Sequence, residues 1–280
     1  MSDLHAFLAA RSEKVIETSC ARVYLQPNRA LKIKKPVNFG FLDYSTLEKR
    51  QWALQRELNF NRAAAPDIYR MVHAVMRDGD GFNFDGVGEP VEYALEMRRF
   101  DDEAVLAHQP WAVDPDLAET LGRTVARFHA QAKILPRGGV AALNFTVGSN
   151  AEVLRDLGDR LGPDLEATLA ATDHAWAHIR PLIEERERQG FSRHCHGDLH
   201  LGNILLENGR PVLFDCIEFN DVLSELDVIY DLAFLLMDLH FRRRTDAANR
   251  VLNAYLDEAA RHFPETLWAG LAALPLTQSV

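Results

Sequence analysis

The octapeptide HGDLHLGN at residues 196–203 limits the possible folds of this chain more than any other feature, because Asp215 follows its last residue by twelve positions. Two glycines and several polar side chains predict a loop for the octapeptide. Beyond Asn203, short apolar runs flank an Asn-Gly pair at 208–209, and this dipeptide is a strong signal for a tight hairpin turn. A hairpin brings its two ends together, so the sequence predicts that Asn203 and Asp215 are neighbours.

An amide oxygen and a carboxylate oxygen at the two ends of a hairpin form a candidate site for a divalent cation. Mg²⁺ usually takes one or two protein ligands and completes its coordination with phosphate and water. Asp198 lies in the preceding loop, where a carboxylate can orient an acceptor hydroxyl. The set of Asp198, Asn203 and Asp215 therefore indicates phosphoryl transfer from a magnesium-bound nucleotide.

The octapeptide resembles the HGDxxxxN motif of aminoglycoside phosphotransferases and related small-molecule kinases. The resemblance implies an α+β, bilobal, protein-kinase-like fold, with an N-lobe of small antiparallel sheet (1–97) and a mostly helical C-lobe (98–280). It also implies ATP and Mg²⁺ as cofactors and a small-molecule hydroxyl as acceptor. The residues that the resemblance assigns to catalysis are Asp198 and His196, and those that it assigns to the metal are Asn203 and Asp215.

Asp215 stands where kinases carry the Asp of the DFG motif, but the residues after it are Cys-Ile-Glu-Phe, without Phe-Gly. The strings at 213–220 and 230–234 most resemble one bacterial branch of uncharacterised phosphotransferase-family proteins. Members of that branch often continue into a P-loop kinase domain. This chain has no GxxxxGK[ST] motif, and its apolar end at 267–280 has no polar cap. We therefore expect a truncated piece that lacks a C-terminal P-loop kinase domain.

The N-terminal third is expected to hold the nucleotide. Short strands are predicted at 22–25 and 30–33, joined by a turn. Ala30 and Lys32 share one face of the second strand. In the resembled fold the small residue admits the base and the lysine reaches the phosphates. Lys34 lies on the same face and is an alternative to Lys32, and both lysines could instead be surface charges on an edge strand.

A helix is predicted from an N-cap at Ser45, with Glu48 completing a capping box, to about residue 65. Glu57 lies beside the apolar face of this helix. The resemblance implies that Glu57 pairs with the strand lysine, whereas a solvated glutamate is the ordinary alternative.

No glycine-rich loop precedes the first strand, and Thr18 and Ser19 stand in its place. The resemblance implies that they contact phosphate, with ordinary turn residues as the alternative. The alternating stretch 91–97 predicts a further strand that leads into a polar segment. The resemblance places the hinge, whose backbone binds adenine, at Glu96, Met97 and Arg98.

Two residues outside the loop, His129 and Asp231, are expected to support the loop or the core. Asp114 followed by Pro115 predicts a helix start. His129 lies beside the apolar face of that helix, where a core or supporting histidine is more common than a catalytic base. The resemblance implies that Asp231 accepts hydrogen bonds from amides of the catalytic loop and so holds Asp198 in place.

Composition narrows the class of protein further. A chain of 280 residues can form two lobes with separate cores. Its formal net charge of −10 argues against general nucleic-acid binding and is compatible with a cationic acceptor or with a solvated acidic surface. The longest apolar stretch is too short for a membrane span. With no signal-peptide core at the start and three cysteines without a CxxC pair, we expect a cytoplasmic protein with reduced thiols.

Two other classes compete with the kinase-like interpretation. The histidines around residues 194–200 resemble a zinc cluster, but the last histidine comes one residue late and further ligands would be needed. A non-catalytic nucleotide-binding regulatory module of a longer protein is the second alternative. The missing glycine-rich loop favours that module, whereas the complete set of Asp198, Asn203 and Asp215 favours an active phosphotransferase.

Overall fold

The structure is a computed structural model that describes residues 2–40, 42–158, 162, 164–264 and 270–274. The chain forms two compact units. Unit 1 contains the chain up to Asp102 together with Glu218–Asn220, and unit 2 contains Glu103–Ile217 and the chain from Asp221 onward. Unit 1 is built on an antiparallel sheet and unit 2 is mostly helical, so the predicted α+β class is confirmed.

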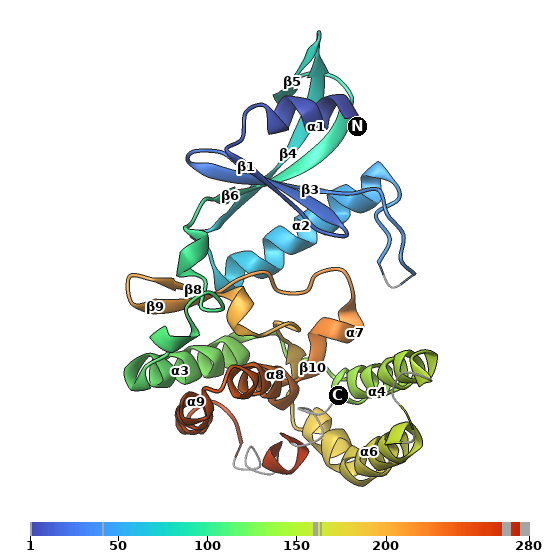
Figure 1. Ribbon diagram of the computed structural model, residues 1–280, viewed down its shortest axis with the longest axis vertical. Helices are drawn as coiled ribbons and strands as arrows, with labels where there is room; N and C mark the ends of the chain where they lie inside the picture. Colours follow the sequence, from blue (N-terminus) through green and yellow to red (C-terminus); the bar gives the residue numbers. More distant parts are fainter. Residues whose placement is uncertain (1, 41, 159–161, 163, 265–269, 275–280) are drawn as a thin grey trace. The chain divides into compact units, whose positions relative to one another are not determined.

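Unit 1 contains a six-stranded antiparallel sheet with the strand order β1-β2-β3-β6-β4-β5 (Figure 1). Its elements are α1 (Ser2–Ala9), β1 (Lys14–Glu17), β2 (Ala21–Leu25), β3 (Arg29–Lys34), α2 (Leu47–Ala64), β4 (Tyr69–Asp78), β5 (Gly81–Phe84) and β6 (Pro90–Arg98). The strands predicted in the first hundred residues are β2, β3 and β6, each one or two residues longer than expected.

Alternation along β3 separates the apolar core from the charged face of the sheet. Leu31 and Ile33 are buried in an apolar cluster that includes residues of α1. Successive side chains of a strand point to opposite faces. Lys32 and Lys34 therefore lie on the other face, where α2 packs on β4 and β6.

Helix α2 begins one residue later than predicted. Its N-cap is Thr46, whose hydroxyl accepts a hydrogen bond from the amide of Lys49 at 3.3 Å. Ser45, the predicted cap, instead donates its hydroxyl to Asp43 at 2.6 Å. Both residues carry a hydroxyl that can cap a helix. Because the hydroxyl of Ser45 is bound to Asp43, that of Thr46 caps α2.

Unit 2 is a helical body with two small pairs of strands, β7 with β10 and β8 with β9. Its elements are η1 (Asp102–Ala104), η2 (Pro110–Ala112), α3 (Pro115–Gln131), α4 (Gly139–Asp156), α6 (Asp164–Arg188), β7 (Ser192–His194), η3 (Leu201–Asn203), β8 (Ile204–Glu207), β9 (Arg210–Leu213), α7 (Asp221–Ser224), β10 (Glu225–Asp227), α8 (Val228–Phe241) and α9 (Thr245–Ala259). The first of these, η1, begins at the last residue of unit 1. Helix α3 starts as predicted, since Asp114 accepts the amide of Leu117 at 2.8 Å.

Helices α3 and α9 lie side by side with their backbones in close approach (Figure 1). A Cβ atom added to Gly122 of α3 would lie 2.4 Å from the carbonyl oxygen of Val251 and 2.9 Å from the amide nitrogen of Tyr255. Real Cβ atoms do not approach other atoms that closely, so the spacing of these two helices requires glycine at position 122.

Two expectations concern membrane spans and the end of the chain. None of the helices in the described part of the chain combines the length and the apolar character that crossing a bilayer requires. The apolar helix predicted for 267–280 falls largely outside the described residues.

Two matched glycine substitutions test the close approach of α3 and α9. Gly122→Ala should lower the free energy of unfolding by about 1–3 kcal/mol, because the methyl group meets the backbone of α9. Gly148→Ala on α4 should raise it by about 0.5–1 kcal/mol, since no atom beyond the adjacent backbone of the same helix lies within 4 Å of that Cβ position and alanine favours helix. Urea denaturation measures both. Equal stability of the two variants would contradict the assigned helix spacing.

Candidate active site

The carboxylate of Asp231, in the first turn of α8, binds the backbone of the loop at 196–198. The amide of His196 donates to Asp231 Oδ2 at 3.0 Å, and the amide of Gly197 donates to Oδ1 at 2.9 Å. Gly197 has a φ of 83°, and a Cβ there would lie 2.5 Å from the carbonyl oxygen of Leu223. The loop can follow this path only with glycine at position 197, and Asp198 is the next residue along it.

Asp231 is itself fixed by a buried histidine. His129 Nε2 lies 3.0 Å from Asp231 Oδ2, and its Nδ1 lies 3.0 Å from the hydroxyl of Tyr255. Burial alone raises the pKa of Asp231, but the hydrogen bond and charge of His129, together with His196, outweigh it and hold the pKa below its ordinary value. Asp231 is therefore an ionised acceptor for the loop amides.

His196 is fully buried and links the loop to the end of β9. Its Nε2 donates to the carbonyl oxygen of Phe214 at 2.9 Å, and its Nδ1 accepts from the amide of Asp198 at 3.3 Å. Burial lowers the pKa of His196. The neutral ring therefore uses both nitrogens inside the protein, which suits support of the loop better than contact with a substrate.

The carboxylate of Asp198 is partly exposed, with 41% of its side chain accessible. Its Oδ2 accepts from Asn203 Nδ2 at 3.0 Å and lies 3.4 Å from His200 Nε2. The amide of Gly202 donates to His200 Nδ1 at 2.9 Å, which leaves the proton of a neutral ring on Nε2, facing Asp198. Two donors thus orient one oxygen of an accessible carboxylate.

His200 is a member of this site that the sequence analysis considered only as part of a zinc cluster. The hydrogen bond to Asp198 raises the pKa of His200. The sequence signal for this role was the position of His200 two residues after Asp198. In a loop this short, the side chains of His200 and Asn203 can both reach the Asp198 carboxylate.

Asn203 and Asp215 flank the open end of the β8–β9 hairpin. The predicted turn forms at Asn208 and Gly209, both with positive φ, and Ile204 pairs with Leu213. The amide of Phe214 donates to the carbonyl oxygen of Asn203 at 3.0 Å, so Asp215 follows directly after the last paired residue.

The side-chain amide of Asn203 is oriented for a metal ligand. Its Nδ2 donates to the main-chain oxygen of Asp198 at 2.8 Å and to its carboxylate at 3.0 Å. The other atom of the amide, Oδ1, is the one that a hard cation would bind. Asp215, with a left-handed φ of 62°, is the next residue after Phe214, whose amide binds the main-chain oxygen of Asn203. An amide oxygen and a carboxylate oxygen fit Mg²⁺, which takes few protein ligands and retains water or phosphate.

A second group with metal-like spacing, among the residues the structure describes, is the buried set His129, Cys195 and Asp231. These are not the residues of the zinc cluster considered from the sequence. The bond between His129 and Asp231 already occupies both groups, and burial raises the pKa of the Cys195 thiol. A metal would have to displace the hydrogen bonds that hold the loop, so this set does not fit a metal centre.

In unit 1, both candidate lysines of β3 reach the same glutamate of α2. Lys32 Nζ lies 2.6 Å from Glu57 Oε1, and Lys34 Nζ lies 2.7 Å from Glu57 Oε2. Lys34 is 3% exposed and Lys32 is 14% exposed at the side chain. Lys32 is therefore the more accessible of the two to a ligand, and Lys34 lies deeper in the unit.

Lys34 also binds Glu218, which sequence reasoning did not consider. Lys34 Nζ lies 2.6 Å from Glu218 Oε1, which also accepts from the hydroxyl of Tyr44 at 3.1 Å. Burial alone lowers the pKa of Lys34, but the carboxylates of Glu218 and Glu57 outweigh it and raise the pKa. Lys34 is thus a buried ammonium ion shared by two carboxylates.

The remaining predicted residues are placed as follows. Thr18 accepts the amide of Ala21 at 3.0 Å within the turn between β1 and β2, and Ser19 is exposed in that turn. Glu96 pairs with arginines at 29 and 70, each at 2.9 Å. The amide of Arg98 donates to the carbonyl oxygen of Ile68 at 2.7 Å. Thr18, Glu96 and Arg98 therefore have structural partners inside unit 1.

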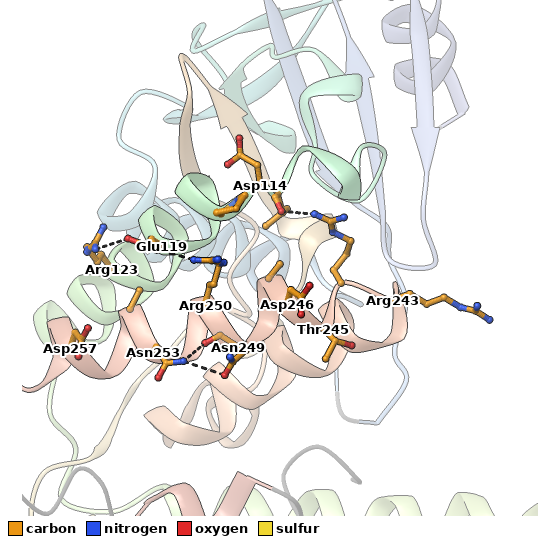
Figure 2. A pocket seen from close by; sticks show the side chains of 15 residues that line it. Asp114, Glu119, Arg123, Arg243, Thr245, Asp246, Asn249, Arg250, Asn253 and Asp257 are labelled. Atoms are coloured by element: carbon orange, nitrogen blue, oxygen red, sulfur yellow. Dashed lines mark hydrogen bonds and ion pairs between the residues drawn. The ribbon is translucent and has the colours of Figure 1, made fainter.

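A polar groove of about 650 Å³ lies along α3 and α9 (Figure 2). None of the residues predicted for the site lines it. Glu119 at its wall pairs with Arg123 at 2.9 Å and faces Arg250 at 3.8 Å, and Figure 2 shows the two arginines on either side of this carboxylate. Because opposite charges in the wall neutralise one another, the groove does not define a class of ligand.

The sequence profile of the phosphotransferase enzyme family matches residues 49–273, and the chain belongs to this family. Rv2004c, an uncharacterised protein of Mycobacterium tuberculosis, is 34% identical over 261 residues, covering 90% of this chain and 51% of the relative. The chain thus spans about half the length of the curated relatives that it matches.

Solved structures share the fold at low sequence identity. A choline/ethanolamine kinase family protein from Mesorhizobium loti has a TM-score of 0.58 at 15% identity, over 99% of this chain and 80% of that one. The GDP complex of aminoglycoside 2′-phosphotransferase-IIIa has a TM-score of 0.58 at 14% identity, over 100% and 89%. The fold is that of the protein-kinase-like small-molecule kinases, as the resemblance implied.

The environments of the two loop histidines predict opposite pKa shifts. His200 should titrate above its ordinary pKa of about 6.5 and His196 below it. Because the folded pKa of His200 is raised, its contribution to stability is present below about pH 6.5 and is lost as the pH rises through the folded value.

NMR titration of the ring protons measures both histidines. Asp198→Asn should lower the pKa of His200, because the carboxylate is the main cause of its shift. An unchanged pKa of His200 in that variant would contradict the hydrogen bond between the two residues.

Proposed function

We propose that this chain transfers the γ-phosphate of ATP to a hydroxyl group of a small molecule. The observation that carries the proposal is the geometry around Asp198, an accessible carboxylate held by Asn203 and His200 at the end of a hairpin that presents Asp215. Membership of the phosphotransferase enzyme family supports it.

In the proposed reaction, Asp198 accepts a hydrogen bond from the acceptor hydroxyl and directs its oxygen toward the γ-phosphorus. The bond from that oxygen to the γ-phosphorus forms as the bond between this phosphorus and the bridging oxygen breaks, which releases ADP, and the proton passes late to Asp198. Asn203 and His200 keep the carboxylate oriented. Most of the acceleration comes from positioning and charge neutralisation rather than from proton transfer.

Separate residues are proposed for the metal ion and for the phosphates. Asn203 Oδ1 and Asp215 would hold Mg²⁺, which neutralises charge on the phosphates when it is bound. Lys32, held at 2.6 Å from Glu57, contributes an ammonium group for a phosphate oxygen. Lys34 is the less suitable lysine because two buried carboxylates already surround it.

The acceptor is proposed by class. The fold relatives carry the names choline/ethanolamine kinase family protein and aminoglycoside 2′-phosphotransferase. The compounds in these names all combine hydroxyl groups with cationic nitrogen groups. The formal net charge of −10 on this chain is compatible with such a cationic acceptor. A panel should therefore contain aminoglycosides, amino alcohols and sugars. It should be tested with both ATP and GTP, because one fold relative was solved with GDP.

Substitution of the catalytic carboxylate tests the role of Asp198. Asp198→Asn should lower the rate of phosphoryl transfer by about 10²–10⁴-fold, as expected for loss of a general base, and leave nucleotide affinity nearly unchanged. Radiolabelled γ-phosphate transfer and calorimetric nucleotide binding measure the two effects. Asp246→Asn, an exposed carboxylate of the same unit, is the control. Full transfer by the Asp198 variant would exclude this mechanism.

Substitution of the second metal ligand tests the Mg²⁺ site. Asn tolerates the left-handed backbone of position 215, so Asp215→Asn removes the charge with little strain. It should weaken nucleotide binding in the presence of Mg²⁺ by roughly tenfold or more, or ~1.4 kcal/mol, with a smaller effect in the presence of a chelator. If the substitution weakened nucleotide binding equally with Mg²⁺ and with a chelator, Asp215 would not be a metal ligand.

A further inference from the structure

The segment after Asp215 leads from one unit into the other. The amide of Ile217 donates to the carbonyl oxygen of His196 at 2.9 Å, within unit 2. The next residue, Glu218, belongs to unit 1, where its carboxylate binds Lys34 at 2.6 Å. A single peptide bond therefore joins a residue fixed to the catalytic loop and a residue fixed to β3.

Lys34 extends this connection to the candidate phosphate-binding lysine. Its ammonium group lies 2.7 Å from Glu57 Oε2, and the other oxygen of Glu57 lies 2.6 Å from Lys32. Carboxyl and ammonium groups thus alternate from Glu218 through Lys34 and Glu57 to Lys32. The start of this series lies three residues after Asp215 in the sequence.

Because this series is buried, we expect it to fix the positions of its side chains more than it adds to the stability of the fold. Lys34, Glu57 and Glu218 are each at most 5% exposed at the side chain. Buried ion pairs add little net stability compared with apolar residues of similar volume, because both charges lose their hydration. Their geometry is nevertheless well defined, since removal of one partner leaves the other charged and buried.

We propose that Lys34 and Glu218 are positioning residues that couple the phosphate-binding Lys32 to the metal ligand Asp215, so that the nucleotide and Mg²⁺ bind cooperatively. This inference rests on the function proposed above. A shift of the segment after Asp215 would alter the partners of Lys34, and Glu57 would pass that change to Lys32. By linkage, the coupling is reciprocal, since Mg²⁺ raises nucleotide affinity by the same factor as nucleotide raises Mg²⁺ affinity.

The experiment compares the dissociation constant of ATP in excess chelator with that in excess Mg²⁺, by calorimetry on the full chain. The ratio of the two constants measures the coupling. Glu218→Gln should reduce this ratio by about fivefold or more, with little change in the chelator value. Thermal unfolding of the same samples measures the loss of stability separately.

A second buried pair in unit 1 supplies a matched control. Arg50 and Glu92 contact each other at 2.9 Å and join α2 to β6. Arg50 also donates to the main-chain oxygen of Tyr44 at 3.0 Å, and Glu92→Gln keeps that donor in place. Glu92→Gln should lower the melting temperature, as Glu218→Gln does, and leave the ratio unchanged. A purely structural role for Glu218 predicts instead that both variants behave alike.

If Glu218→Gln does not fold, the double variant Lys34→Met/Glu218→Gln replaces it, because it leaves neither member of the pair charged and alone. The same fall in the ratio is expected. An unchanged ratio in a folded Glu218 variant, or an equal fall in Glu92→Gln, would overturn the inference while the proposed function stands. Absence of Mg²⁺-dependent ATP binding in the unsubstituted chain would reject the proposed function and the inference with it.

Discussion

Inside unit 2, the carboxylate of Asp231 accepts the amides of His196 and Gly197 and lies 3.0 Å from the ring of His129. A carboxylate removed from water costs several kcal/mol unless charged hydrogen bonds replace its hydration. Here the replacement donors are the backbone of the loop itself. The loop can therefore leave this path only by depriving Asp231 of two of its donors, which strongly favours the observed backbone conformation at His196 and Gly197.

Unit 1 uses buried charge in a different way. Glu57 is fully buried and lies between two ammonium groups, Lys32 and Lys34, rather than beside backbone amides. Side chains can rearrange more easily than the backbone of a short loop, so this network can respond to a ligand. The carboxylate of unit 2 is thus held by backbone amides, whereas the buried charges of unit 1 are held by other side chains.

Short-range signals accounted for much of the fold. Alternation identified β3 and β6, the Asn-Gly pair identified the β8–β9 hairpin, and Asp114 identified the start of α3. The choice between Ser45 and Thr46 as a cap was wrong by one residue, because two adjacent hydroxyls give the same signal. The proposed roles for Asp198, Asn203 and Asp215 came from motif spacing and from the family resemblance.

The sequence did not reveal two of the buried pairs, because the members of each pair lie far apart along the chain. His129 and Asp231 are separated by 102 positions, and Lys34 and Glu218 by 184. Neither pair has a periodic or motif signal, since an isolated histidine or glutamate has many possible partners. Packing of whole elements brings them together, and only the three-dimensional structure reveals which partner each one finds.

Gly122 connects helix packing with the electrostatics of the loop. Tyr255, whose backbone nitrogen faces Gly122, carries the hydroxyl that contacts His129 on the same helix as the glycine. The absence of a side chain at position 122 therefore sets the spacing of α3 and α9, and with it the distance between the Tyr255 hydroxyl and His129. A side chain that moved α9 outward would lengthen that bond first and would then loosen the orientation of His129 toward Asp231. In this family member, the absence of a methyl group on one helix is part of what orients a carboxylate on another.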